Sequence, residues 1–131
     1  MHPLSIAIYA MLAASVLPVL TAGLAKGFGR FKPKDNQNPR VFQQNLTGVA
    51  ARVNAAQMNS YETLPIFLAA VLAAEYMVVP QPLVNYFACA YVFLRVIYIA
   101  AYALNLATFR SIIWALSFLC PLYLFYMAAH L

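Results

Sequence analysis

Four long apolar stretches, separated by short polar segments, dominate the chain. They cover residues 4–25, 57–79, 83–106 and 111–129. Each is close to the roughly 20 residues that a helix needs to cross the hydrocarbon core of a bilayer. The pattern predicts an all-α integral membrane protein, with residues 1–131 forming a single domain built as a four-transmembrane-helix bundle.

The composition supports a chain surrounded by lipid. Hydrophobic residues make up 65% of the sequence and charged residues 8%, with a mean hydropathy of +0.77. A soluble domain carries about a quarter charged residues, because its surface faces water. Cys89 and Cys120 lie inside apolar stretches without metal-ligand spacing. We interpret both cysteines as small buried hydrophobic residues rather than a disulfide.

The basic residues predict the direction of the chain in the membrane. Lys26, Arg30, Lys32, Lys34 and Arg40 follow the first apolar stretch, and Arg110 separates the last two. Cytoplasmic loops carry an excess of such residues, so both termini are expected on the non-cytoplasmic side. Clusters of this kind are ordinary topology signals, and no nucleic-acid partner is expected. The first stretch lacks the basic start of a signal peptide. The compact loops favour a bacterial inner membrane, although a protein of the endoplasmic reticulum would share most of these features.

The segment after the first apolar stretch contains a second helix signal. Asn38 followed by Pro39 is typical of a helix start, with asparagine as the N-cap and proline at the first helical position. A helix from there to Val79 would be about 60 Å long. That length is twice the thickness of the membrane. Either the helix projects well beyond the bilayer, or Gly48 interrupts it.

Polar side chains recur at helical spacing on two of the predicted helices. On the second, Arg52, Ala55, Asn59 and Glu62 share one face. On the third, the corresponding face carries Tyr91, Arg95, Tyr98, Tyr102 and Asn105. Ionisable groups inside a span are costly and usually face the interior of the bundle or a water-filled cavity.

These polar groups are expected at a similar depth. At 1.5 Å per residue from the turn at 80–82, Glu62 lies roughly 26 Å down, and Tyr98 and Tyr102 about 22 and 28 Å. Arg95, at roughly 18 Å, has a side chain long enough to reach toward Glu62. Two interpretations stay open from spacing alone. The layer is a ligand site, or Arg95 and Glu62 form a buried pair that only locks the bundle.

The chemistry of the layer suits a small zwitterionic or anionic ligand. Arginine and lysine bind carboxylates, asparagine pairs with peptide groups, and glutamate binds an ammonium group. A cation beside a thiol also stabilises its thiolate form. The sequence shows no Ser-His-Asp arrangement, no metal-ligand cluster and no phosphate-binding loop. The reactive group would therefore belong to the ligand, and no metal is expected.

Three motifs in the expected order resemble the MAPEG family, the membrane-associated proteins of eicosanoid and glutathione metabolism. Asn59-Ser60-Tyr61-Glu62-Thr63-Leu64-Pro65 resembles its Asn-x-x-Glu-x-x-Pro signature. Arg95, Tyr98 and Tyr102 resemble its arginine followed by spaced aromatic positions. Arg110 stands where the family carries an arginine at the start of the fourth helix. The resemblance covers the whole chain in length, span number and topology.

The resemblance implies a homotrimer that binds glutathione between adjacent subunits, in the cytoplasmic half of the membrane. Asn59 and Glu62 would hold the peptide and its amino end, with Tyr98, Tyr102 and Arg95 around them. Arg52 and Lys26 are looser matches for the ligand carboxylates, and Arg110 would stabilise the thiolate. The implied activity is that of a glutathione-dependent transferase or peroxidase. Its second substrate would be a lipophilic electrophile or a lipid hydroperoxide from the bilayer.

The sequence departs from the family pattern at three places. Ala55 stands where eicosanoid-type members carry an arginine, and Trp114 stands where one branch carries a tyrosine. The segment 35–40 has no evident counterpart, and it either caps the site or is a solvated loop. We expect the latter.

Two other classes of function are compatible with the pattern. A non-catalytic membrane scaffold would use Arg95 and Glu62 only for structure. A small proton-coupled multidrug transporter usually needs a carboxylate near the midplane of the membrane, exposed alternately to both sides. The position of Glu62 near one boundary argues against the transporter.

Overall fold

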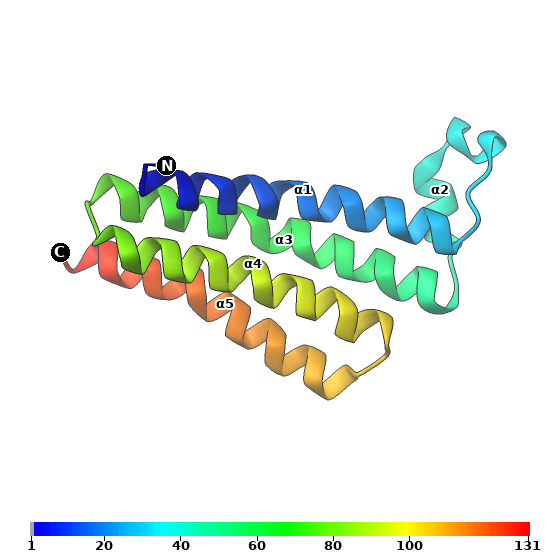
Figure 1. The fold of residues 1–131 in the computed structure, drawn as a ribbon. Helices are drawn as coiled ribbons and strands as arrows, with labels where there is room; N and C mark the ends of the chain where they lie inside the picture. Colours follow the sequence, from blue (N-terminus) through cyan, green and yellow to red (C-terminus); the bar gives the residue numbers. More distant parts are fainter. Residues whose placement is uncertain (1) are drawn as a thin grey trace.

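The fold is an antiparallel bundle of four long helices with a small helical excursion between the first two (Figure 1). The computed structural model describes residues 2–131, and no strand occurs among them. The elements are α1 (Leu4–Phe28), the short 3-10 helix η1 (Pro33–Gln37), α2 (Pro39–Gln44), α3 (Gly48–Tyr76), α4 (Gln81–Ala103) and α5 (Ala107–Ala129). The all-α prediction is confirmed.

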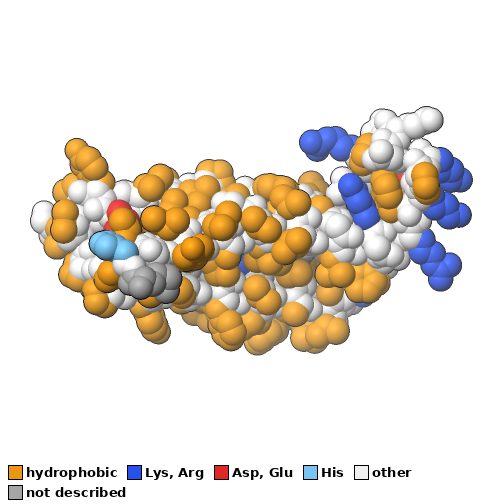
Figure 2. Space-filling model, turned by 45° about the horizontal axis from the view of Figure 1, so that its top comes forward, with side chains coloured by type: hydrophobic (Ala, Val, Ile, Leu, Met, Phe, Trp, Pro, Cys, Tyr) orange, Lys and Arg blue, Asp and Glu red, His pale blue; other side chains and the backbone are white. Residues whose placement is uncertain are grey.

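The bundle has two chemically different ends. Both termini and the turn from α3 to α4 lie at one end, here called the terminal end (Figure 1). The other, the basic end, carries η1, α2 and the turn from α4 to α5, and its lysines and arginines form the blue cluster in Figure 2. Among the eight lysines and arginines of the chain, Arg95 alone lies within the apolar interior.

Three helices are long and apolar enough to cross a membrane: α1, α4 and α5. The fourth long helix, α3, contains Arg52, Glu62 and Glu75, and packs against all three. Large apolar side chains cover the outside of the bundle between its two ends (Figure 2). A soluble protein would not tolerate so large a continuous apolar surface. The chain is therefore a multi-pass integral membrane protein.

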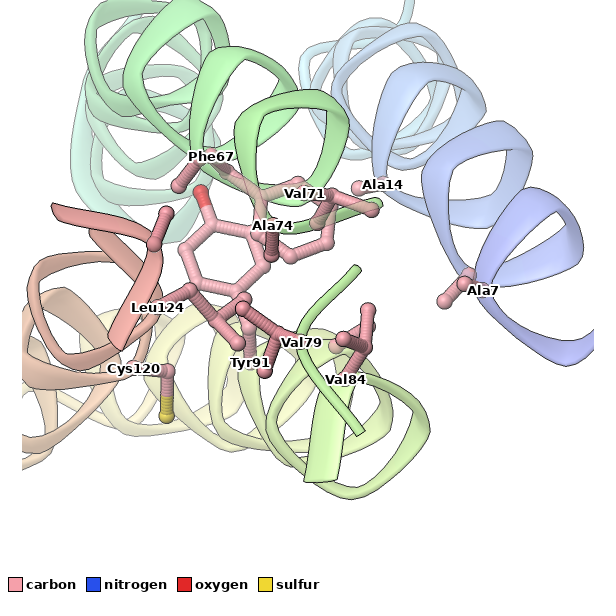
Figure 3. Close-up of a cluster of buried hydrophobic side chains, with 14 residues drawn as sticks. Ala7, Ala14, Phe67, Val71, Ala74, Val79, Val84, Tyr91, Cys120 and Leu124 are labelled. Carbon is pink, nitrogen blue, oxygen red and sulfur yellow. The ribbon is translucent and has the colours of Figure 1, made fainter. Parts of the chain in front are cut away.

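Small and aromatic residues form the core in the terminal half of the bundle (Figure 3). Ala7 and Ala14 of α1 belong to this core together with Phe67 and Ala74 of α3, and small residues let helix backbones approach closely in membranes. Tyr91 stacks on Phe67 at 4.0 Å between ring centroids. Its hydroxyl group shares a 2.9 Å hydrogen bond with Thr63. Tyr91 is thus a core residue, although the sequence pattern had placed it in a polar stripe.

The structure corrects several predicted boundaries. α3 begins at Gly48, well before residue 57, and α2 is a separate helix that ends at Gln44. The helix from Asn38 is therefore interrupted, at residues 45–47, and Gly48 takes a positive φ of 61°. The Asn38 side chain accepts a hydrogen bond from the Val41 amide, as expected of an N-cap.

The turns between the last three helices also differ from those that the sequence indicated. α4 begins at Gln81, whose side chain donates one hydrogen bond to Glu75 across the turn and another to Asn85 within α4. α4 ends at Ala103, so Asn105 lies in the turn to α5 rather than on the polar face of a helix. Cys120 is buried as predicted, but Cys89 is exposed on the outside of α4, so its predicted burial is wrong.

Three helices end with a non-glycine residue in the left-handed conformation. Arg30 follows α1 with φ 59°, Val78 follows α3 with φ 58°, and Asn105 follows α4 with φ 60°. Each ends its helix with a pair of backbone hydrogen bonds to the last turn, such as Val79 to Ala74 and Val78 to Glu75. Asparagine tolerates this conformation, whereas a β-branched side chain is strained in it.

Replacing Val78 with glycine should therefore stabilise the protein by about 1 kcal/mol, because relief of the left-handed strain exceeds the entropy cost of glycine. The Val78 side chain is 82% exposed and loses little packing. Met77 is a matched control, since its φ of −85° gives glycine no advantage. Thermal unfolding in detergent should show a higher midpoint for Val78→Gly and a lower one for Met77→Gly. Equal shifts would contradict the assignment of strain to Val78.

Candidate functional site

A buried guanidinium group joins three helices near the middle of the bundle. Arg95 of α4 is 1% exposed. Its Nη2 donates to Asn59 Oδ1 at 2.7 Å and to Ser60 Oγ at 3.0 Å, both on α3, and its Nη1 reaches Ser117 Oγ on α5 at 3.5 Å. Nε has no partner. Arg95 thus donates its hydrogen bonds to neutral oxygens. Because these oxygens belong to α3 and α5, the bonds determine how both helices are rotated relative to α4.

Two aromatic rings lie between two cations on the way from Arg95 toward the basic end. The Arg95 guanidinium lies 4.1 Å from the centre of the Tyr98 ring. Tyr98 meets Tyr102 edge to face at 5.8 Å, and the Arg110 guanidinium lies 4.3 Å from the Tyr102 ring. Cation–π contacts of this kind orient both partners. The four side chains therefore form one ordered row, the cation–aromatic row, along α4 and into the first turn of α5.

A pocket opens beside this row. It has a volume of about 220 Å³ and is lined by Asn59 of α3, Tyr98 and Tyr102 of α4, and Arg110, Ser111 and Trp114 of α5. We call it the Arg110 pocket. Arg110 sits in the first turn of α5, where the positive end of the helix dipole adds to its own charge. Both favour an anion in the pocket, and the phenols and the amide can orient it by hydrogen bonds.

A second polar pocket lies on the other side of α3. It has a volume of about 750 Å³ and is lined by Ala22 and Lys26 of α1, Pro39, Arg40 and Gln43 of α2, and Gln57, Met58, Tyr61 and Glu62 of α3. We call it the Lys26 pocket. It combines two cations, one carboxylate and two amides, so it can bind a ligand that carries both signs of charge.

The structure separates residues that the sequence placed in one layer. Asn59, Tyr98, Tyr102 and Arg110 come together, but Glu62 and Lys26 line the other pocket. The predicted contact between Arg95 and Glu62 is wrong. The side-chain partners of Arg95 are Asn59, Ser60 and Ser117, and Glu62 is exposed.

Arg52 lies in neither pocket. Its Nε donates to the Ala103 carbonyl at 3.2 Å, at the last residue of α4. This contact ties the start of α3 to the end of α4, which is a structural role. Among the residues that the structure describes, no group of three histidine, cysteine or acidic side chains could hold a metal ion.

Several residues at the site were not found from the sequence. Ser60 and Ser117 are the hydroxyl partners of Arg95, and Ser111 and Trp114 line the Arg110 pocket. Ser117 lies seven residues after Arg110, on the same face of a helix, which is a periodic signal that could have revealed it. Gln43 had no such signal, because its place depends on how α2 folds back. Arg40 belongs to the segment 35–40, for which capping of the site was the less favoured of the two open interpretations.

Comparison with known proteins identifies the family of this chain. The sequence model of the MAPEG family matches residues 6–130, nearly the whole chain. No curated protein and no solved structure matches the sequence or the fold.

Replacing Arg95 with alanine should lower the free energy of unfolding by about 3 kcal/mol, because it leaves three oxygens without their donor and opens a cavity. Val96 is the neighbouring control. It is 48% exposed on the outside of α4, and its replacement with alanine should cost no more than about 1 kcal/mol. Titration with SDS in mixed micelles measures both values. Similar losses for the two variants would contradict the central role of Arg95.

Proposed function

The chain belongs to the MAPEG family, and on this basis we propose that it is a membrane-embedded glutathione-dependent transferase or peroxidase. Membership places it at family level among membrane proteins of eicosanoid and glutathione metabolism. The observation that carries the finer proposal is the Arg110 pocket. It gathers a cation, two phenols, a hydroxyl and an amide, and contains no nucleophile of the usual protein kinds other than the Ser111 hydroxyl. No general base lines the pocket beside that hydroxyl.

In the proposed mechanism, Arg110 holds the thiolate of glutathione in the pocket. Its contact with the Tyr102 ring orients the guanidinium group, and Asn59 offers its amide to the peptide. Arg95 holds the Asn59 oxygen, so the Asn59 amide nitrogen is left to donate to a peptide carbonyl. The pocket thus binds the ligand through groups whose directions are fixed before the ligand arrives.

The chemistry needs no further protein group. In the transferase reaction, the thiolate sulfur forms a bond to the electrophilic carbon, and the leaving group departs with the bonding electron pair. In the peroxidase reaction, the sulfur attacks the distal oxygen of a hydroperoxide, the O–O bond breaks, and the alkoxide takes a proton to become an alcohol. A second glutathione then reduces the sulfenic acid to a disulfide and water. The apolar outside of the bundle gives lipophilic substrates access from the bilayer.

A homotrimer is the second part of the proposal. The Arg110 pocket is smaller than the roughly 300 Å³ at which ligand pockets usually begin, and one chain leaves it open. The exposed Glu62 side chain lies on α3 about 21 Å from the end of that helix at Tyr76, and a carboxylate facing lipid is costly. Contact with neighbouring subunits would cover α3 and complete the pocket. Native mass spectrometry should then show three copies, and a monomer at all detergent concentrations would contradict this part.

Glutathione should raise the thermal midpoint of the protein, because a ligand that binds only the folded state stabilises it. Conjugation of an aryl halide should be measurable, and Arg110→Ala should lower kcat/KM at least about 100-fold by removing the charge opposite the thiolate. Lys34 is a matched control, since it is an exposed cation of η1 outside both pockets. Lys34→Ala should keep full activity.

Two outcomes would contradict the proposal. If glutathione neither shifts the midpoint nor is conjugated, the chain would instead fit a non-catalytic scaffold. If Arg110→Ala equals the wild type in a protein that does conjugate glutathione, the thiolate must be held elsewhere.

A further inference from the structure

The connection between α1 and α3 is a folded helical element rather than an irregular loop. Asp35 accepts a hydrogen bond from the Lys32 amide at 2.9 Å, which fixes the start of η1. Phe31 and Phe42 meet edge to face at 4.9 Å. These local contacts give η1 and α2 a defined helical shape. The segment 35–40 is therefore not an irregular loop, although most of its side chains are exposed to solvent as expected.

Two further contacts attach α2 to the bundle. Gln43 donates through Nε2 to Asn54 Oδ1 on α3 at 3.1 Å. At Gly29, which follows α1, a Cβ atom would collide with the Leu46 side chain and make a tight contact with the Phe42 ring. The close approach at Gly29 and the hydrogen bond to α3 hold α2 against both neighbouring helices. α2 therefore forms one wall of the Lys26 pocket.

The side chain that α2 brings to this pocket is Arg40. It lines the pocket together with Lys26 and Glu62 and is exposed to solvent. The other cation of the pocket is Lys26. Its Nζ lies 5.0 Å from the centre of the Phe31 ring, so this ammonium group already has an aromatic partner. Among the described residues, no side chain forms a hydrogen bond or ion pair with Arg40, and a guanidinium group can bind a carboxylate with two parallel hydrogen bonds.

We propose that Arg40 binds one carboxylate of the ligand, and that α2 is a ligand-binding element of this chain. The inference deepens the proposed function and rests on it. It also explains how a carboxylate can be bound although Ala55 stands where eicosanoid-type members of the family carry an arginine. Ala55 lines neither pocket and has no charge. In this proposal the ligand carboxylate is bound by a side chain of α2, at the wall of the Lys26 pocket, and not by a side chain of α3. Glu62, in the same pocket, is available for the ammonium group of the same zwitterion.

Calorimetry with a set of ligands tests this contact. The probes are glutathione and its two monoamides, each lacking one carboxylate. Arg40→Gln should weaken the binding of glutathione about tenfold or more, which is the value of a charged hydrogen bond. For the monoamide that lacks the carboxylate held by Arg40, the same substitution should change the affinity less than about twofold, because the contact is already gone.

Arg30 provides the matched control. It is an exposed arginine of the same connection and lies outside the Lys26 pocket, so Arg30→Gln should leave all three affinities unchanged. The thermal midpoint of Arg40→Gln without ligand should equal that of the wild type, because the side chain is exposed and α2 is held by other residues.

The outcomes separate this inference from the proposed function. If the wild type binds glutathione and Arg40→Gln binds it equally well, the inference is wrong and the proposed function stands. If Arg40→Gln weakens glutathione and both monoamides by the same factor, Arg40 acts only through general charge and the inference is again wrong. If the wild type binds none of the three, the proposed function fails and the inference fails with it.

Discussion

A guanidinium group without a carboxylate partner is the constraint on which the rest of the bundle depends. Arg95 is buried between α3, α4 and α5, where a lone charge is costly unless its donors are paired. Asn59, Ser60 and Ser117 supply neutral oxygens from two helices, and the Tyr98 ring covers one face. The rotation of each helix is therefore determined by the need to aim an oxygen at the same point. Small core residues then let the helices close around it.

The same constraint links the stability of the bundle to the geometry of its candidate site. Asn59 accepts from Arg95 and also lines the Arg110 pocket. Tyr98 stacks against Arg95, and through Tyr102 it orients Arg110. A substitution of Arg95 would therefore alter the geometry of the Arg110 pocket, because the cation–aromatic row joins the two. This arrangement pre-orients the proposed ligand-binding groups on rigid helices rather than on loops.

The helices could be predicted from the sequence because lipid demands long apolar stretches, and the depth of each polar residue followed from the rise per residue. The direction in which a side chain points could not be obtained in this way. Glu62 and Asn59 lie at similar depth but about 60° apart around α3, and that rotation places them in different pockets. The fold of α2 also escaped prediction, because it depends on Gly29 and on a hydrogen bond between Gln43 and Asn54.

The separation of the two pockets has a consequence for any assembly. A ligand that used both pockets of one chain would have to pass over the outward face of α3, across the exposed Met58 and Tyr61 side chains. In a closed ring, every interface is the same, and one surface of each subunit meets a different surface of the next. If the two surfaces that meet in the proposed trimer are those that hold the pockets, the Arg110 pocket of one subunit would face the Lys26 pocket of its neighbour. The thiolate would lie beside one chain and the carboxylate beside α2 of the other, so α2 would matter for the ligand bound by its neighbour's Arg110.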